Sequence, residues 1–318
     1  MRSRLGRSAD LRQTQRFPFM IINITWKKSG WLPQRAQSDA AAFTCTELFA
    51  VIATVALVVV TLLPAFAHSR PDAQTFQCLN NHKQLMLAWQ VYAADHADRV
   101  PNNFTIPDTL NAITSGKLDN WANNVMTWGA TTSTEDRSNT NELWIKNGVF
   151  GKYTGSSVRI YKCPSDLYLG LAQSRAGWIQ RNRSISMNSL CGRSDRLASS
   201  TTGRSWSEGG AYRQFLKTSD VAFPAMTWVT VDEHPDSINE GFFVVPFNTS
   251  TWGDLPASLH DGACSFSFAD GHVEVHKWLS GTSKYPVRFS FGPIRTFDAA
   301  GRQDFQWYKD RTGYILFR

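Results

Sequence analysis

Three side chains near the C-terminus have types and spacing that could bind a metal ion. His272, Glu274 and His276 alternate with Val273 and Val275. In a β-strand, alternate residues point to the same face, so the two imidazoles and the carboxylate would lie together. Such a set could coordinate a metal ion. The alternative, which we favour, is a solvated face on the outside of a hairpin.

An acidic group lies earlier in the chain and offers a second possible ligand set. Asp232, Glu233, His234 and Asp236 follow a strand-like run within five residues. Their carboxylate oxygens are ligands that Ca²⁺ prefers. Whether loops bring them to His272, Glu274 and His276 is not encoded locally, so we expect no cofactor, with Ca²⁺ as the alternative.

A β-hairpin over residues 264–278 would position the histidines. Phe266 and Phe268 alternate with polar residues, and valines alternate again after Asp270-Gly271. An Asp-Gly pair between two alternating runs predicts a tight turn, in which Gly271 supplies the positive φ.

The remaining pattern predicts an α+β fold. Residues 78–98 have apolar side chains at helical spacing, which indicates an amphipathic helix. Residues 99–120 contain two prolines and several asparagines, which predict a loop. A helix followed by short strands favours a mainly antiparallel sheet. Beyond the hairpin, strand-like runs occupy residues 158–163, 185–188, 227–232 and 242–247.

The five cysteines suggest a disulfide and give no sign of catalysis. No C-x-x-C spacing occurs, so zinc is not predicted, and no base is identifiable beside any cysteine, so we expect no catalytic cysteine. We favour a disulfide between Cys78 and Cys163, which would tie the helix to the first strand; buried free thiols are the alternative. The others are Cys45, Cys191 and Cys264.

The positive charge is concentrated in the first 42 residues. They hold eight of the 33 basic and two of the 26 acidic residues, although the whole chain has a net charge of +7. The remainder is nearly neutral and has no basic run, which excludes a nucleic-acid-binding surface. Positive charge before an apolar segment orients the N-terminus toward the cytoplasm.

An uncharged segment, residues 48–67, follows this basic region. Twenty helical residues span about 30 Å, the thickness of a bilayer core. A retained membrane helix is one interpretation. A signal peptide cleaved after Ala65-Phe66-Ala67 and a buried core helix are the others. Just before the segment, Thr44 and Glu47 have the spacing of a capping box.

This junction resembles the N-terminus of type IV pilins and type II secretion pseudopilins. The similar stretch reads FTCTELFAVIATVALVVVTLLPAFA. The resemblance implies that prepilin peptidase cuts between Ala42 and Phe43, and that Phe43 is then methylated. It further implies that Glu47 pairs with the N-terminal amine of a neighbouring subunit and that Pro64 kinks the helix. Ala42 stands where the family has glycine, and a start at Met20 instead of Met1 would shorten the leader to 23 residues.

A second motif resembles a C-terminal signature of pseudopilin-like proteins from planctomycete and verrucomicrobial bacteria. It consists of His260, nine residues, then Asp270-Gly271. The resemblance implies a pilin-like fold, in which a long N-terminal helix, transmembrane and then amphipathic, packs on the sheet domain. The expected segments are a cleaved leader (1–42), a transmembrane and filament helix (43–67), its amphipathic continuation (68–98) and a globular domain (99–318).

The function that these features imply is structural. We expect a single-pass inner-membrane subunit with a cytoplasmic N-terminus and a periplasmic or extracellular domain. It would assemble with its own copies through the N-terminal helices and would require prepilin peptidase and a secretion or pilus assembly platform, type II protein secretion being one process it could serve. The alternative is an exported metal-dependent enzyme or glycan-binding protein with a site in residues 232–276.

Overall fold

The computed structural model describes residues 44–316 except 291 and 293, and it leaves out the side chains of residues 60–72 in the first helix. The chain divides into two units, Met1–Leu57 and Val58–Arg318. The predicted leader, with Ala42 and Phe43, lies outside the described residues. So does the side chain of Pro64.

Helix α1 (Cys45–Asp95) begins with the predicted capping box. The Thr44 amide donates to Glu47 Oε2 at 2.8 Å, and the Glu47 amide donates to Thr44 Oγ1 at 3.3 Å. Side chains 44–59 are exposed. No helix in the described part of the chain combines the length and apolar character needed to cross a membrane. The predicted membrane segment extends to residue 67, and the side chains of residues 60–67 are not described.

The fold is α+β, with a five-stranded, mostly antiparallel sheet. The strand order is β3-β1-β2-β4-β5. Strand β1 pairs antiparallel with β2 and parallel with β3, and the β2–β4 and β4–β5 pairs are antiparallel. The strands are β1 (Ile185–Asn188), β2 (Trp228–Asp232), β3 (Phe242–Phe243), β4 (Ala263–Phe268) and β5 (Val273–Lys277).

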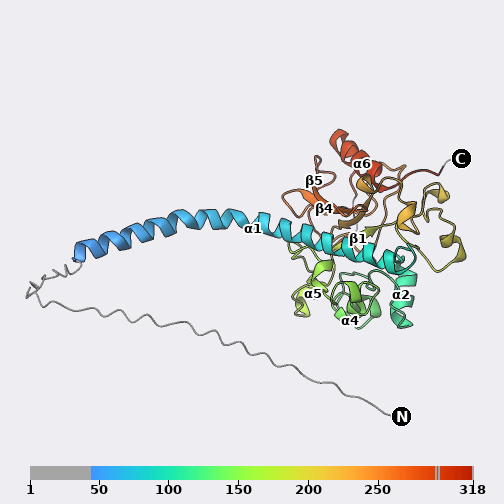
Figure 1. Ribbon diagram of the computed structural model, residues 1–318, viewed down its shortest axis with the longest axis horizontal. Coiled ribbons are helices and arrows are strands. Elements are labelled where there is room, and N and C mark those ends of the chain that lie inside the picture. Colours follow the sequence, from blue (N-terminus) through green and yellow to red (C-terminus); the bar gives the residue numbers. More distant parts are fainter. Residues whose placement is uncertain (1–43, 291, 293, 317–318) are drawn as a thin grey trace, which may run out of the picture. The chain divides into compact units, whose positions relative to one another are not determined.

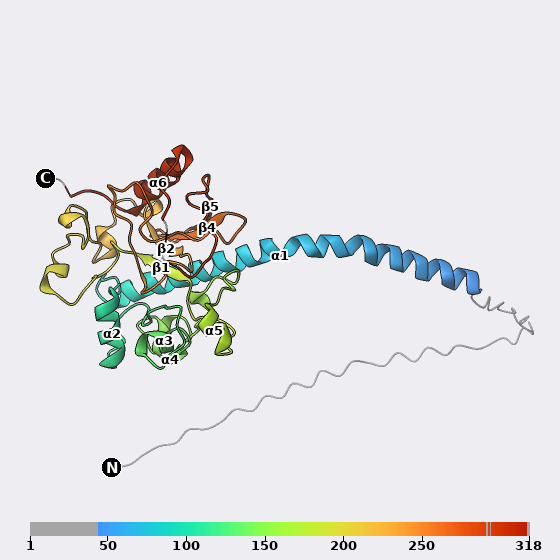
Figure 2. The same cartoon turned by 180° about the vertical axis from the view of Figure 1, so that it is seen from behind.

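The two faces of the sheet are covered by different helices. Within residues 58–318, α1 passes between the sheet with α6 (Ala299–Thr312) on one side and helices α2, α4 and α5 on the other (Figure 1; Figure 2). An irregularity in the β2–β4 register lies between Trp228 and Thr230. Such a bulge re-aims the residues that flank it. Trp228 therefore packs against Tyr308 of α6, whereas Thr230 hydrogen-bonds to α1.

Two predictions of secondary structure are wrong, and a third is too long, because the strand expected over residues 242–247 is only β3, Phe242–Phe243. Residues 99–120 contain helix α2 (Ile106–Thr114), because Pro107 lies in its first turn, where a proline needs no hydrogen-bond partner. Residues 158–163 form no strand but a 3₁₀ turn, Arg159–Tyr161, and the Arg159 and Lys162 carbonyls accept hydrogen bonds from Asn81. The other short helices are α3 (Thr134–Ser138), α4 (Glu142–Lys146) and α5 (Leu171–Arg175).

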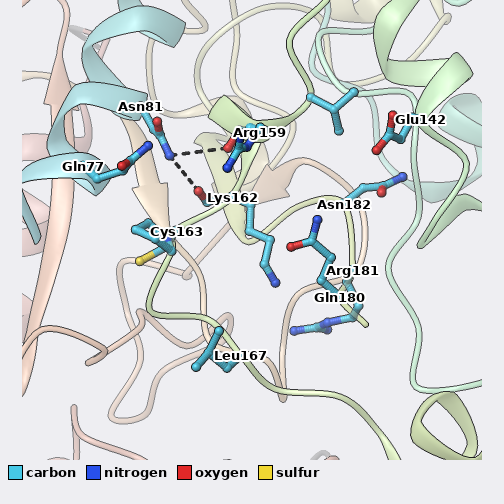
Figure 3. A pocket seen from close by; sticks show the side chains of 12 residues that line it. Gln77, Asn81, Glu142, Arg159, Lys162, Cys163, Leu167, Gln180, Arg181 and Asn182 are labelled. Atoms are coloured by element: carbon cyan, nitrogen blue, oxygen red, sulfur yellow. Dashed lines mark hydrogen bonds between the residues drawn. The ribbon is translucent and has the colours of Figure 1, made fainter. Parts of the chain in front are cut away.

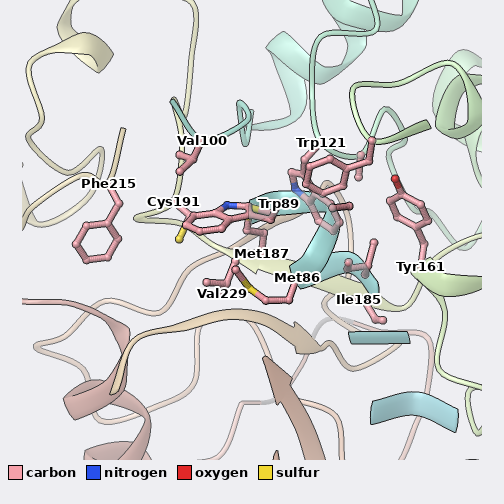
Figure 4. Close-up of a cluster of buried hydrophobic side chains, with 14 of the residues drawn as sticks. Met86, Trp89, Val100, Trp121, Tyr161, Ile185, Met187, Cys191, Phe215 and Val229 are labelled. Atoms are coloured by element: carbon pink, nitrogen blue, oxygen red, sulfur yellow. The ribbon is translucent and has the colours of Figure 1, made fainter. Parts of the chain in front are cut away.

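The C-terminal part of α1 has the predicted buried face. Leu85 and Trp89 have exposed fractions of 0% and 1%. Figure 4 shows Met86 and Trp89 of α1 among side chains from β1 and β2, including Met187 and Val229. The helix is therefore an integral part of the domain core.

The predicted hairpin is present. Strands β4 and β5 pair from Ala263↔Lys277 to Ser267↔Val273. The connection is closed by the Phe268 amide, which donates to the His272 carbonyl at 3.0 Å. Gly271 has a φ of +95°, a value that favours glycine over every other residue.

Candidate functional site

Four side chains from four distant segments meet where helix α1 passes the end of strand β2. They are Cys78, Cys163, Asp232 and His260, and their potential metal-ligand atoms all lie within 4.8 Å of one another. We call them the Cys₂-Asp-His cluster. All four side chains are buried.

Helix α1 presents three residues to the cluster. Thr75, Cys78 and His82 are three and four positions apart, so they lie on one helix face. The other members follow the ends of elements: Asp232 is the last residue of β2, and Cys163 follows the 3₁₀ turn Arg159–Tyr161. The Cys163 amide donates to Ser184 Oγ at 2.7 Å, which fixes the backbone there.

The Asp232 carboxylate is the centre of the cluster. The Cys78 thiol donates to Oδ2 at 3.1 Å, and His82 Nε2 and His260 Nε2 lie 3.3 and 3.6 Å from the two oxygens. Burial alone would raise the pKa of Asp232, but His82 and His260 outweigh this and hold it well below its ordinary value. The carboxylate is therefore ionised and paired with imidazoles.

Cys163 and His260 form a close pair that the sequence did not reveal. Cys163 Sγ lies 3.3 Å from His260 Nε2. Burial alone would lower the pKa of His260, but hydrogen bonds to Asp232 and Cys163 raise it to about 10. For Cys163, burial acts in the other direction and would raise the pKa, but hydrogen bonds with Cys78 and His260 lower it below its ordinary value. Our expectation that no cysteine has a base beside it is wrong.

The arrangement favours coordination over nucleophilic catalysis. In a catalytic relay the acid and the nucleophile bond to opposite nitrogens of the histidine. Here Nε2 of His260 faces both Cys163 and Asp232, and Nδ1 lies 3.1 Å from Thr75 Oγ1. The donor atoms therefore surround one point instead of forming a chain.

A surface pocket of about 470 Å³ borders the cluster at Cys163. Figure 3 shows Lys162 extending along this pocket beside Cys163. Lys162 Nζ and Arg181 Nη2 lie 3.8 and 3.4 Å from Asp166, so two cations share one carboxylate. The pocket therefore adjoins the cluster on the side of Cys163.

The predicted acidic group does not converge on one site. Asp232 belongs to the cluster, but Glu233 accepts hydrogen bonds from Ser186 and Ser237. Burial raises the pKa of Glu233 to about 8. Asp236 accepts the amide hydrogens of residues 288 and 289. Both carboxylates are occupied because the chain turns after β2 and directs them to other segments.

The hairpin residues that were the alternative metal site do not converge either. His272 lies 2.6 Å from Asp270 at the surface, and His276 stacks on Trp307 with 3.6 Å between ring centroids. Glu274 pairs with Phe266 across the sheet. In the described residues, the only group of at least three potential ligands is the Cys₂-Asp-His cluster. Trp307, on which the His276 ring stacks, belongs to helix α6.

The predicted disulfide is not formed. Cys78 and Cys163 are adjacent, and both are free thiols. Burial, the hydrogen bond with Cys163 and the charge of Asp232 raise the pKa of Cys78 well above its ordinary value.

Both ends of the His260 to Asp270-Gly271 signature contact helix α1. His260 lies beside Thr75. At the other end, Lys83 Nζ donates to the Gly271 carbonyl at 2.5 Å, and Gln90 Nε2 donates to the Ala269 carbonyl at 3.2 Å. The signature residues therefore hold the hairpin against the helix.

A buried carboxyl outside the cluster, Glu240, should make the free energy of unfolding depend on pH. Burial raises the pKa of Glu240 from 4.5 to about 7. The folded state therefore binds more protons than the unfolded state in this window, and stability falls as the pH rises through it. We expect the advantage of Glu240→Gln over the natural chain to grow by about 2–3 kcal/mol between about pH 4.5 and 8.

Chemical denaturation at several pH values measures this effect. Glu142→Gln, at an exposed site on α4, should follow the profile of the natural chain. Parallel profiles for Glu240→Gln and the natural chain would contradict the assignment.

Comparisons with protein-family models, curated proteins and solved structures found no match to this chain. The fold and the cluster by themselves describe an α+β protein with a buried Cys₂-Asp-His group.

Proposed function

We propose that the chain is a pilin-like structural subunit, similar to type IV pilins and type II secretion pseudopilins. Prepilin peptidase would cut before Phe43, and the mature N-terminal helix would anchor the subunit in the inner membrane and pack against other copies in a filament. The α+β domain would face the periplasm or the exterior. No catalytic step is part of this function.

The observation that carries the proposal is the dual character of α1. Its first turn holds the Thr44–Glu47 capping box. The capping box is followed by apolar side chains that are exposed by 50% or more: Leu48, Phe49, Val51, Ile52, Val55 and Leu57. Toward its end, the same helix buries Leu85 and Trp89 in the domain core. A helix that is apolar and exposed in one part and core-forming in another suits assembly through one end and domain attachment through the other.

Glu47 offers the sharpest test of assembly. A carboxylate at the threshold of an apolar helix is costly unless it is paired. In a filament, the N-terminal amine of a neighbour would supply that partner. Glu47→Ala should therefore abolish recovery of the subunit in sheared filaments, and Glu47→Gln should reduce it strongly. Immunoblots of sheared and cellular fractions measure the ratio.

Glu142→Ala, which removes an exposed carboxylate paired with Lys146, is the matched control and should leave assembly unchanged. Mass spectrometry of the mature chain should find a methylated Phe43 at the N-terminus. A mature chain that begins at His68 would overturn the proposal and favour signal-peptide export. Normal assembly of Glu47→Ala would exclude the pairing role.

A further inference from the structure

We propose that Cys78, Cys163, Asp232 and His260 bind one Zn²⁺ ion that stabilises the domain. The distances are those of a nearly formed site. Cys78 Sγ lies 3.1 Å from Asp232 Oδ2, Cys163 Sγ lies 3.3 Å from His260 Nε2, and this nitrogen lies 3.6 Å from Asp232 Oδ2. The site would be present whether or not the chain assembles into a filament.

The spacing of the donors fits tetrahedral coordination. Zinc bonds of about 2.0–2.3 Å place neighbouring ligand atoms about 3.3–3.8 Å apart. The three separations above are close to these values, and all four donor atoms lie within 4.8 Å of one another. Three of the donor separations therefore already match those of a tetrahedral site.

The donor types select zinc over calcium and magnesium. Two cysteine sulfurs and one imidazole nitrogen are soft or intermediate ligands, which suit Zn²⁺. Calcium needs six to eight oxygen ligands, and the cluster offers one carboxylate. Binding would release the thiol protons of Cys78 and Cys163, because zinc coordinates thiolates.

Neighbouring residues orient the ligands as in established zinc sites. His260 Nδ1 lies 3.1 Å from Thr75 Oγ1, so the hydroxyl can accept its proton and leave Nε2 for the metal. His82 Nε2 lies 3.3 Å from Asp232 Oδ1, and its Nδ1 lies 2.7 Å from Thr230 Oγ1. One carboxylate oxygen is thereby held by His82 while the other faces the cluster.

The site would join segments that are far apart in the sequence. It would link α1 through Cys78, the segment before β1 through Cys163, the end of β2 through Asp232 and the loop before β4 through His260. Cross-links between distant segments lower the entropy of the unfolded chain, so they stabilise the fold.

The zinc content of the full chain, purified without chelators, tests the proposal. We expect about one zinc ion per chain by elemental analysis. Cys78→Ser, Cys163→Ser and His260→Asn should each lose the metal. Cys191→Ala and His272→Asn, which alter a buried cysteine and a histidine outside the cluster, should retain it. His82→Gln should weaken zinc binding by about 10–100-fold, because it removes an orienting partner.

A second measurement needs no variant and so does not depend on their folding. The chain loaded with Co²⁺ should give the visible absorption of a tetrahedral cobalt site with thiolate ligands. Unfolding the zinc form under non-reducing conditions should release all five thiols.

Two outcomes would overturn the proposal. One is a metal-free chain that binds neither Zn²⁺ nor Co²⁺ at saturation and has five free thiols. The other is a chain with a Cys78–Cys163 disulfide, detected as two missing thiols after unfolding, that binds no zinc after mild reduction.

Discussion

Substitution of Asp232 by alanine is expected to lower the free energy of unfolding by about 3–5 kcal/mol. The carboxylate is the partner of His82 and His260, both buried, and it accepts a hydrogen bond from Cys78. Its removal leaves these groups without compensation in a region that water does not reach. Denaturation in urea with a chelator present measures the loss without any contribution from bound metal.

Asp261 provides a matched control for this substitution. It lies one residue after His260, and its exposed side chain pairs with Lys277. Asp261→Ala should leave the unfolding transition where it is, because an exposed ion pair contributes little. A loss below about 1 kcal/mol for Asp232→Ala would contradict a central role for the carboxylate.

Substitution of Trp89 by alanine should be comparably damaging. Trp89 is 1% exposed and projects from helix α1 toward residues of β1 and its flanking loops (Figure 4). Truncation of a buried tryptophan costs about 3–5 kcal/mol, because it loses apolar burial and leaves a cavity. Trp89→Phe, which fills part of that space, should lose less. Thermal or chemical unfolding of the full chain measures both.

Phe76 is the control for this experiment, since it lies on the same helix with an exposed fraction of 75%. Phe76→Ala should change the free energy of unfolding by no more than about 0.5 kcal/mol. Equal effects of Trp89→Ala and Phe76→Ala would mean that α1 does not contribute to the core.

Elements with strong local patterns were predictable from the sequence. Alternation of apolar and polar residues identified β1 to the residue and the β4–β5 hairpin within one or two residues. The amphipathic face of α1 was equally visible, because Leu85 and Trp89 recur at helical spacing. Such signals arise from burial of one face, which requires no knowledge of the partner.

Other elements depend on context that the sequence hides. The prolines of residues 99–120 suggested a loop, yet Pro107 lies in the first turn of α2. The strand-like run in residues 158–163 forms the 3₁₀ turn Arg159–Tyr161, and it pairs with no strand in the described part of the chain. In both cases the same residues are compatible with two structures, and tertiary contacts choose between them.

The four members of the cluster were noticed for three different reasons and never as one group. Cys78 and Cys163 suggested a disulfide, Asp232 suggested a calcium ligand and His260 belonged to a signature. No local spacing connects them, because the order of the strands and the position of α1 bring them together. The absence of C-x-x-C therefore excluded only one kind of zinc site, the kind built within a short loop.

The contacts at the two ends of strand β4 constrain its length. Its six residues rise about 3.3 Å each, or about 20 Å in total. The stretch of α1 from Thr75 to Gln90, which contacts the segments before and after it, advances about 22 Å at 1.5 Å per residue. This helix stretch and the strand are of similar length, and Lys83, in the middle of the stretch, also contacts the hairpin at Gly271. An added or deleted residue in β4 would detach one end from the helix, so the nine residues between His260 and Asp270 are a dimension of the domain.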